Sequence, residues 1–371
     1  MRDLIVFGED FGGLPSSTQH LVTRLAKQRK VLWVNSIGLR QPKFTSHDIK
    51  RVIFKLMGKG KSGYRNSLET PNNITVVNLR TIPAPHSAFA RYIAKALICA
   101  QLRPIVKRLD LNKPVLWSSL PTAADLCGSL GESSVVYYCG DDFSSLAGVD
   151  HNVVAQHELK LVDHADLIFA ASAKLLAKFP QNKTRYVPHG VDTELFRHPA
   201  PRAKDLPCAT KKIAGFYGSL SNWLDYQLIH QICLDNPNWE FVFIGPIELN
   251  YNPLPQLSNV HYLGPKAHHE LPSYSQHWDV SLLPFVANDQ IASCSPLKLL
   301  EYLAARSHVI STPFPALTPY VDYVDVAADA NAFSSALKSL DQTRSAVTLT
   351  DIDENSWNAR SQLVHQMLES L

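Results

Sequence analysis

The sequence of 371 residues lacks the features that mark several large classes of protein. Its six cysteines never stand in a Cys-x-x-Cys pair, which argues against a zinc site or a thioredoxin-like motif. They are scattered through apolar runs, as reduced core cysteines are, which favours the cytoplasm. No stretch approaches the roughly 20 apolar residues of a membrane helix. The first apolar run, Leu4–Phe7, is too short for a signal peptide and predicts a strand instead.

A large excess of charge of one sign is also absent. The formal net charge is +3, which is too small to predict nucleic-acid binding, so no nucleic acid is expected as a partner. Hydrophobic residues make up 45% and charged residues 19% of the chain, a balance that excludes a disordered protein. The length exceeds what one core usually organises, and this predicts two domains.

Short apolar runs alternate with longer amphipathic stretches, which predicts an α/β protein with doubly wound sheets. In the first half we expect strands at Leu4–Phe7, Val31–Val34, Ile74–Val77, Val115–Trp117, Val135–Tyr138 and Leu167–Ala170, with helices at Ser17–Gln28, Ser87–Leu109 and His151–Ala165. In the second half we expect strands at Ile213–Tyr217, Phe241–Ile244, Val260–Leu263, Val280–Leu283 and His308–Ser311, with helices at Leu224–Leu234, Leu271–Ser275 and Leu297–Ala305. A polar segment with prolines, 198–212, predicts the linker between two Rossmann-like domains that face a cleft.

Two motifs of the second half suggest an anion site. Gly218 and Ser219 directly follow a predicted strand and precede a helix, where backbone N–H groups can approach a phosphate. An ordinary strand-to-helix turn is equally compatible with this position. The segment Cys294–Ala304 has proline near its start, and its Lys298 and Glu301 share one helical face. Lys298 is suited to a diphosphate and Glu301 to ribose hydroxyls, although a surface ion pair is the commoner meaning of this spacing.

Two motifs of the first half suggest catalytic or substrate-binding groups. Asp141 and Asp142 end a predicted strand, where a carboxylate can take a proton from a hydroxyl group and its neighbour can raise its pKa. A helix N-cap is an equally good explanation. The glycine loop after the first strand, with Gly12 and Gly13, is not the Gly-x-Gly-x-x-Gly fingerprint of dinucleotide binding. It is a candidate loop facing the cleft, followed by His20, which as a lone histidine is more often a packing residue.

Taken together, these residues resemble the GT-B glycosyltransferases. Segment 188–196, Pro-His-Gly-Val-Asp-Thr-Glu-Leu-Phe, is similar to the interdomain signature of that family, and 295–304 to its nucleotide-sugar-binding helix. Segment 217–225 resembles the donor-phosphate loop of the teichuronic-acid-type branch, and 260–265, with Gly264, the strand before the donor-site helix. Segment 355–360 resembles the tail helix that crosses back to the first domain.

The resemblance implies an N-terminal acceptor domain at 1–190, a nucleotide-sugar domain at 191–355 and a crossing helix at 356–371. It implies donor contacts from Gly218, Ser219, Gly264, Ser295, Pro296, Leu297, Lys298 and Glu301. It also implies transfer from a nucleoside-diphosphate sugar to a saccharide or lipid-linked acceptor in polysaccharide or cell-envelope synthesis, with no cofactor and no metal. Many retaining relatives carry two glutamates on the donor helix. Here Glu301 is the second and Ser293 replaces the first, so an inverting reaction with Asp141 as base is the simpler expectation.

Two other functions and a membrane surface remain open. A nucleotide-sugar epimerase shares the fold, and a non-catalytic sugar-nucleotide-binding protein would share the donor site. The basic stretch from Arg40 to Arg65 favours a transferase on an anionic acceptor or membrane, although a solvated loop is as good an explanation. The helix expected at Ser87–Leu109 places Phe89 and Leu97 on one side with basic residues elsewhere, and we expect Pro104 to kink or end it. The expected location is cytoplasmic, with peripheral binding to the inner face of the cell membrane.

Overall fold

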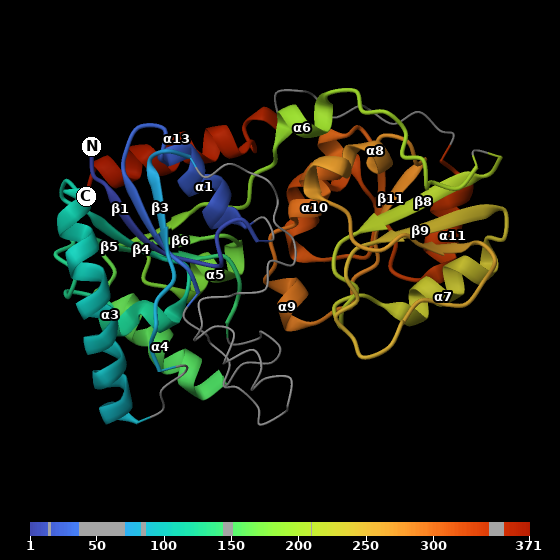
Figure 1. The fold of residues 1–371 in the computed structure, drawn as a ribbon. Helices are drawn as coiled ribbons and strands as arrows, with labels where there is room; N and C mark the ends of the chain where they lie inside the picture. Colours follow the sequence, from blue (N-terminus) through green and yellow to red (C-terminus); the bar gives the residue numbers. More distant parts are fainter. Residues whose placement is uncertain (14–15, 37–70, 83–86, 144–150, 209, 341–351) are drawn as a thin grey trace. The chain divides into compact units, whose positions relative to one another are not determined.

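The computed structural model describes residues 1–371 except 14–15, 37–70, 83–86, 144–150, 209 and 341–351 (Figure 1). The chain divides into two compact units, each with its own hydrophobic core. Unit 1 comprises Met1–Pro188 together with Arg360–Leu371, and unit 2 comprises His189–Ala359. The basic stretch between Arg40 and Arg65 lies outside the described residues.

Unit 1 is built on a seven-stranded sheet in the order β3-β2-β1-β4-β5-β6-β7, and every strand pairing is parallel. Its strands are β1 Leu4–Phe7, β2 Val31–Val34, β3 Ile74–Val77, β4 Val115–Ser118, β5 Ser134–Cys139, β6 Leu167–Ala170 and β7 Thr184–Tyr186. Five of them are buried along their whole length, as strands covered on both faces must be.

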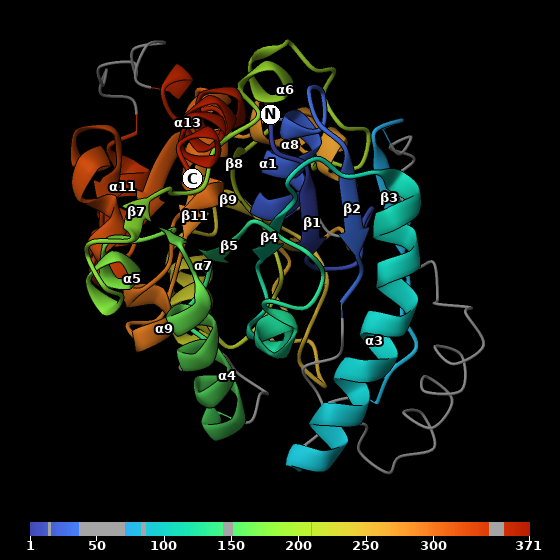
Figure 2. The same cartoon turned by 90° about the vertical axis from the view of Figure 1, so that its left-hand side faces the viewer.

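Helices cover both faces of this sheet (Figures 1 and 2). One face carries α1 and the C-terminal helix α13, and the other carries α3, the 3₁₀ helix η1 and α4. Their bounds are α1 Ser17–Leu25, α3 Ala88–Leu109, η1 Pro121–Leu126, α4 His151–His164, α5 Ala173–Lys178 and α13 Trp357–Glu369. Of the two expected effects of Pro104, a kink or an end, the end is not found, because α3 continues through this proline to Leu109.

Helix α13 is tied to the opposite end of the chain by a buried cation. The Arg29 side chain is fully buried and donates to the backbone oxygen of Arg2 at 3.0 Å. It also contacts His365 and forms an ion pair with Glu369 at 3.4 Å. Glu369 in addition lies 3.5 Å from the amino terminus at Met1. These contacts complete one face of the unit 1 sheet with the last residues of the chain.

Unit 2 repeats the same architecture on a six-stranded parallel sheet in the order β10-β9-β8-β11-β12-β13. Its strands are β8 Lys212–Tyr217, β9 Trp239–Ile244, β10 Val260–Tyr262, β11 Val280–Leu283, β12 His308–Ser311 and β13 Asp325–Val326. Its helices are α6 Thr193–Arg197, α7 Tyr226–Asp235, η2 His268–Glu270, α8 Pro272–Ser275, α9 Asp289–Ala292, α10 Leu297–Ala304, η3 Pro315–Tyr323 and α11 Ala330–Lys338.

Both sheets reverse their strand order at one point, beside β1 in unit 1 and beside β8 in unit 2. Such a reversal opens a crevice beyond the carboxyl ends of the strands, where ligands bind in open α/β sheets. The predicted doubly wound α/β class is confirmed. The motifs around Asp141 and Gly218 therefore lie at the ligand-binding edge of their respective sheets.

Candidate functional site

Three glycines stand side by side at the carboxyl edge of the unit 2 sheet. Gly218 follows β8, Gly245 follows β9 and Gly264 lies two residues beyond β10. The N–H of Gly218 donates to the oxygen of Ile244 at 2.8 Å, and the N–H of Gly245 to that of Gly264 at 3.0 Å. A Cβ on Gly245 would lie 2.0 Å from the oxygen of Gly218. The backbones of two neighbouring strands therefore approach more closely here than any side chain would allow. The sequence predicted Gly218 and Gly264, but not Gly245.

Gly245→Ala is expected to destabilise unit 2 by about 2–4 kcal/mol, because the methyl group overlaps a backbone oxygen and φ is +138°. Gly264→Ala is the matched control. Its φ is also positive, at +68°, but a Cβ there meets no atom within 4 Å. The free energy of unfolding of this control should fall by only about 1–2 kcal/mol, which is the cost of the positive φ without a steric overlap. Urea unfolding measures both variants, and equal losses would contradict the close approach as the cause.

Lys298, on the first turn of α10, lies across the backbone of Gly218. A Cβ on Gly218 would lie 2.1 Å from Cε and 3.0 Å from Nζ of Lys298. Within the described part of the chain, the ammonium makes no hydrogen bond and no ion pair. Burial lowers the pKa of Lys298, and the charges of Glu301, Cys294 and Glu248 only partly oppose this. The edge of the sheet thus presents a half-buried cation that is free to bind an anion.

The residues before Lys298 form the start of α10. Pro296 caps the helix, and Leu297 is its first residue. The hydroxyl oxygen of Ser295 accepts a hydrogen bond from the N–H of His189 at 3.3 Å. Ser219 follows Gly218 in the turn after β8. The partial positive charge of a helix start, next to an ammonium without an ion-pair partner in the described residues, gives this edge the chemistry of a phosphate site.

His189 belongs to this site, although the sequence did not single it out. Burial, reinforced by the charge of Lys298, lowers its pKa to about 4, so the imidazole is neutral at pH 7. The next residue, Gly190, packs against Trp357 so closely that a Cβ would lie 2.9 Å from the indole ring. The signature at 188–196 therefore brings a neutral histidine beside the cation.

Glu301 lies one turn further along α10, and its side chain is only 5% exposed. One of its oxygens, Oε1, accepts a hydrogen bond from Nε2 of His268 at 2.8 Å. The predicted surface ion pair with Lys298 is not formed. Ser293, at the place of the first glutamate in retaining relatives, is buried and donates its hydroxyl to the oxygen of Asp289 at 2.7 Å. The Ser293 hydroxyl therefore bonds within its own segment.

In unit 1, Asp141 lies in the turn directly after β5 and is exposed. Its pKa is nevertheless raised, first because closely surrounding protein atoms disfavour the charged form and second because Glu9 repels it. The sequence predicted a raised pKa from partial burial and from the charge of Asp142. Burial is the larger cause in the structure, and the carboxylate that adds to it is Glu9, which follows β1, rather than Asp142. Because β1, β4 and β5 are consecutive in the sheet, their carboxyl ends bring Glu9 and Asp141 together.

Asp142 has a different role from its neighbour. Its side chain is 9% exposed and forms an ion pair with Lys178 at 2.9 Å. Lys178 also binds Glu158 at 2.8 Å, and Glu158 accepts the hydroxyl of Tyr137 at 2.8 Å. This network links β5, α4 and α5 beneath the turn. Asp142 therefore anchors the turn that presents Asp141.

The glycine loop after β1 lies at the same edge of the unit 1 sheet. The N–H of Gly12 donates to the side-chain oxygen of Gln19 at 3.0 Å, and that of Gly13 to the oxygen of Asp10 at 3.0 Å. His20 lies on the first turn of α1 and is half-buried. The backbone oxygen of His20 accepts a hydrogen bond from Arg24 at 3.2 Å, on the helix that directly follows the loop.

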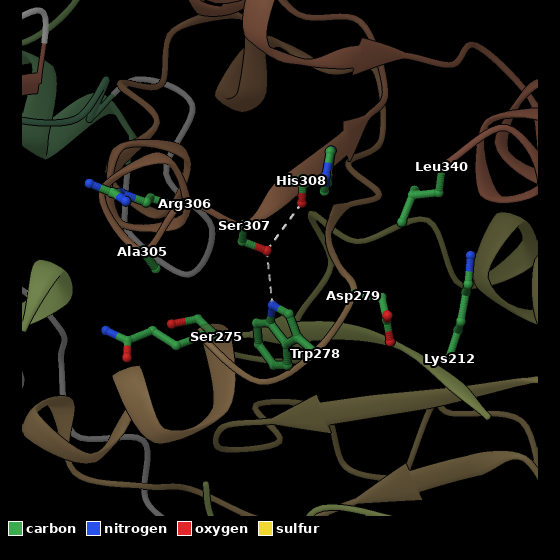
Figure 3. A pocket seen from close by; sticks show the side chains of 10 residues that line it. Lys212, Ser275, Trp278, Asp279, Ala305, Arg306, Ser307, His308 and Leu340 are labelled. Atoms are coloured by element: carbon green, nitrogen blue, oxygen red, sulfur yellow. Dashed lines mark hydrogen bonds between the residues drawn. The ribbon is translucent and has the colours of Figure 1, made fainter. Parts of the chain in front are cut away.

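A polar hollow of about 350 Å³ lies at the other end of the unit 2 sheet (Figure 3). It is lined by residues at the amino ends of β8, β11 and β12, among them Lys212, Asp279 and His308. Trp278 donates to the hydroxyl of Ser307 at 3.2 Å across its floor. The labelled charged side chains spread around the hollow rather than converge, so they do not define an ion site.

Two further properties concern metals and membranes. Among the described residues, no group of three or more His, Cys, Asp or Glu side chains is arranged to hold a metal ion. Of the Asp-x-Asp sequence at 351–353, the first residue lies outside the described part, and Asp353 forms an ion pair with Arg197 at 2.7 Å. No helix in the described ranges is long and apolar enough to cross a bilayer.

Two doubly wound parallel sheets, one in each unit, are the architecture of the GT-B fold, and solved structures agree with this assignment. Anabaena HepE (Alr3699) in complex with UDP and glucose matches with a TM-score of 0.70 at 12% identity, over 100% of both chains. Sucrose-phosphate synthase from Thermosynechococcus elongatus matches with a TM-score of 0.68 at 12% identity, over 100% of this chain and 99% of that one. A glycosyltransferase from Rickettsia africae ESF-5 matches with a TM-score of 0.62 at 11% identity, over 99% and 94% of the two chains.

In sequence, the chain is similar to a Bacillus subtilis (strain 168) protein, "Putative teichuronic acid biosynthesis glycosyltransferase TuaH". The two are 28% identical in an alignment of 235 residues that covers 57% of this chain and 59% of that protein. The match thus spans less than two thirds of the relative's length. No family model matches the chain.

Proposed function

We propose that this protein is a glycosyltransferase that moves a sugar from a nucleoside-diphosphate sugar to a saccharide or lipid-linked acceptor. The observation that carries the proposal is the ammonium of Lys298, which lies over Gly218 at the carboxyl edge of the sheet without an ion-pair partner in the described residues. A diphosphate supplies the missing negative charge, and Glu301 lies one helical turn away for the ribose.

The relatives support a nucleotide-sugar donor in two ways. HepE is described in complex with UDP and with UDP-glucose, and the B. subtilis relative is named for teichuronic acid biosynthesis. These names belong to those proteins. For this chain they support a nucleoside-diphosphate sugar as donor and a role in polysaccharide or cell-envelope synthesis.

In the proposed reaction, Asp141 takes the proton of the acceptor hydroxyl as it attacks the anomeric carbon. Its raised pKa makes it a stronger base than an ordinary aspartate. The bond between the anomeric carbon and the diphosphate breaks, and the nucleoside diphosphate leaves with the electron pair. Lys298 and the start of α10 stabilise the charge that develops on this leaving group, a task for which many transferases use a metal ion. The reaction is therefore proposed to be inverting and independent of metal.

A two-stage experiment tests this function. Purified protein is first screened by thermal shift against nucleoside-diphosphate sugars and the free nucleoside diphosphates. Each donor that binds is then assayed, with EDTA present, for hydrolysis or transfer of the sugar. Stabilisation by a donor and release of nucleoside diphosphate are expected. Absence of binding across the panel would refute the function, and conversion of a donor only to its epimer would replace it with an epimerase.

We also propose that the enzyme acts at the inner face of the cell membrane through α3. This helix packs on the sheet with Ala94, Ile98, Cys99 and Leu102. The opposite side exposes Phe89 by 74% and Tyr92 by 72%, and the same helix carries the exposed Arg103 and Lys107. Exposed aromatic rings and cations on one helix suit the surface of an anionic bilayer.

The protein is expected to co-sediment with anionic liposomes at low salt and to be released at high salt, because the attraction between cations and anionic lipid is screened. Replacing Phe89 and Tyr92 together by serine should reduce the bound fraction. Leu234→Ser, which removes an exposed apolar side chain from α7 of unit 2, should not. Failure to co-sediment at low salt would refute the membrane proposal.

A further inference from the structure

Glu9 is a second carboxylate at the carboxyl edge of the unit 1 sheet, and only one of its oxygens is engaged. The residue lies two positions beyond β1 and is half-buried. Its Oε2 accepts a hydrogen bond from the hydroxyl of Ser16 at 2.9 Å. In the part of the chain that the structure describes, no group donates to its Oε1. Because both oxygens of an ionised carboxyl group are acceptors, Oε1 remains for a donor that a ligand brings.

The loop that carries Glu9 is held in one conformation by its neighbours. The indole N–H of Trp33 in β2 donates to the backbone oxygen of Glu9 at 3.0 Å. The N–H of Phe11 donates to the side-chain oxygen of Asn35, which follows β2, at 2.9 Å. Ser16, which binds the carboxylate itself, is the N-cap of α1. Glu9 is therefore fixed between a central strand and a helix start, as a residue that orients a substrate must be.

Glu9 and Asp141 act on each other and on a common neighbour. Burial raises the pKa of Asp141, the charge of Glu9 adds to this, and no cation among the described residues opposes it. Burial likewise raises the pKa of the Tyr138 hydroxyl, and the charges of Asp141 and Glu9 both contribute. The described residues donate no hydrogen bond to the carboxylate of Asp141. This edge therefore presents two carboxylates with unfilled acceptor sites and no described cation beside them.

An aromatic ring lies in the same loop. Phe11, two positions after Glu9, is partly exposed and packs edge-on against the buried Trp33, with ring centroids 5.1 Å apart. The C–H groups of a sugar ring pack well on an aromatic face, which carries negative potential. The hydroxyl groups of the same sugar donate hydrogen bonds to carboxylates. An aromatic ring beside two carboxylates thus suits an uncharged sugar, whereas an anionic sugar would be repelled.

We propose that Glu9 binds the acceptor through Oε1, which accepts a hydrogen bond from one acceptor hydroxyl while Asp141 takes the proton of the attacking one. The acceptor ring is then an uncharged sugar, and uronic acids and sugar phosphates are excluded from this position. This inference rests on the proposed function, because it concerns the acceptor side of the same reaction. The discrimination arises because a carboxylate or phosphate on the acceptor would face Glu9 and Asp141 together.

Transfer from the identified donor to matched pairs of sugars tests the proposal. The probes are the methyl glycosides of glucose, galactose and mannose, each compared at equal concentration with the corresponding methyl uronide. The members of a pair differ only in the charged group at C6. The wild-type protein is expected to use at least one neutral member about 10-fold better than its uronide. Where water is the only acceptor, the neutral member should inhibit donor hydrolysis better than the uronide by the same factor.

Two matched variants assign the discrimination to Glu9. Glu9→Gln keeps an acceptor oxygen but removes the charge, so the preference for the neutral sugar should fall below about threefold. Asp10→Asn removes the charge of the next residue, whose Oδ1 accepts a hydrogen bond from the hydroxyl of Ser36 at 2.8 Å, and it should keep the full preference.

The pH profile of donor hydrolysis separates this role from a structural one. In Glu9→Gln the acid limb should move to lower pH, because the repulsion that helps to raise the pKa of Asp141 is removed. Asp10→Asn should leave the limb in place. Loss of structure alone would lower the rate at every pH without moving the limb.

The outcomes distinguish the inference from the proposed function. A wild-type protein that neither binds nor turns over any donor would overturn both. Donor turnover in which a uronide serves as well as its neutral partner, or in which no neutral sugar affects either reaction, would overturn the inference and leave the donor reaction in place. A full preference and an unmoved acid limb in Glu9→Gln would overturn the role of Glu9.

Discussion

Replacing Asp141 with asparagine is expected to reduce turnover about 10²- to 10⁴-fold, the factor that general-base catalysis typically supplies. The amide cannot take a proton from the acceptor, while the donor contacts in unit 2 are untouched, so donor affinity should be nearly unchanged. Because the pKa of Asp141 lies above its usual value of 3.8, wild-type turnover should fall as the pH drops through this raised value. Steady-state hydrolysis or transfer with the identified donor measures both effects.

The stability of Asp141→Asn tests whether Asp141 has a structural role. A carboxyl group with a raised pKa in the folded state binds its proton more tightly there than in the unfolded chain. Its contribution to stability is therefore present at low pH and lost as the pH rises through the raised pKa. At neutral pH the asparagine variant should be as stable as the wild type or more stable. A lower melting temperature would point to a structural role instead.

Asp142→Asn is the matched control, because it changes the adjacent carboxylate in the same way. It weakens the ion pair with Lys178 and should lower the melting temperature, with a smaller effect on turnover. Near-normal turnover in Asp141→Asn would contradict the role as base. A product that keeps the anomeric configuration of the donor would do the same.

Replacing Lys298 with alanine is expected to weaken the binding of the nucleoside diphosphate by roughly ten- to a hundred-fold. A charge-assisted hydrogen bond contributes about 1.5–3 kcal/mol, which corresponds to this range. Because the pKa of Lys298 is lowered by burial, wild-type affinity should also begin to decline at a pH below the 10.5 of an ordinary lysine. Titration calorimetry across a pH series measures both effects.

Two variants isolate the charge as the cause. Lys298→Met keeps an unbranched stem over Gly218 without the ammonium, and it should lose about as much affinity as the alanine variant. Lys212→Met removes a lysine from the amino end of β8, the opposite end of the strand that leads to Gly218, and it should bind normally. Unchanged affinity in both Lys298 variants would refute the phosphate contact.

The sequence was sufficient for most of the sheets. Runs such as Leu4–Phe7 and Val31–Val34 are apolar at every position, because both faces of these strands are covered, and their bounds were predicted to the residue. It was not sufficient for β7 and β13, which are two or three residues long and partly exposed at the sheet edges. Short edge strands carry no apolar run that distinguishes them from loops.

The partners of the candidate groups were harder to predict than the groups themselves. Asp141 and Lys298 are marked by strand ends and a helix start, which are local signals. Their neighbours Glu9 and His189 come from segments more than 100 positions away. The strand order brings Glu9 to Asp141, and the contact of His189 with Ser295 brings it to Lys298. Gly245 could have been predicted as a site residue, because it directly follows an apolar strand in the same way as Gly218.

The closure of unit 1 by α13 has a consequence for how the protein is made. The ribosome synthesises residues 1–188 long before Glu369. During that time Arg29 lacks its ion-pair partner, because α13 has not been made. Until α13 has been made, the part of the sheet face that it covers beside α1 (Figure 2) stays open to water and to chaperones. Nascent chains truncated before residue 360 should therefore be protease-sensitive in their N-terminal half, and a solubility tag fused to 1–188 alone should not yield a stable domain.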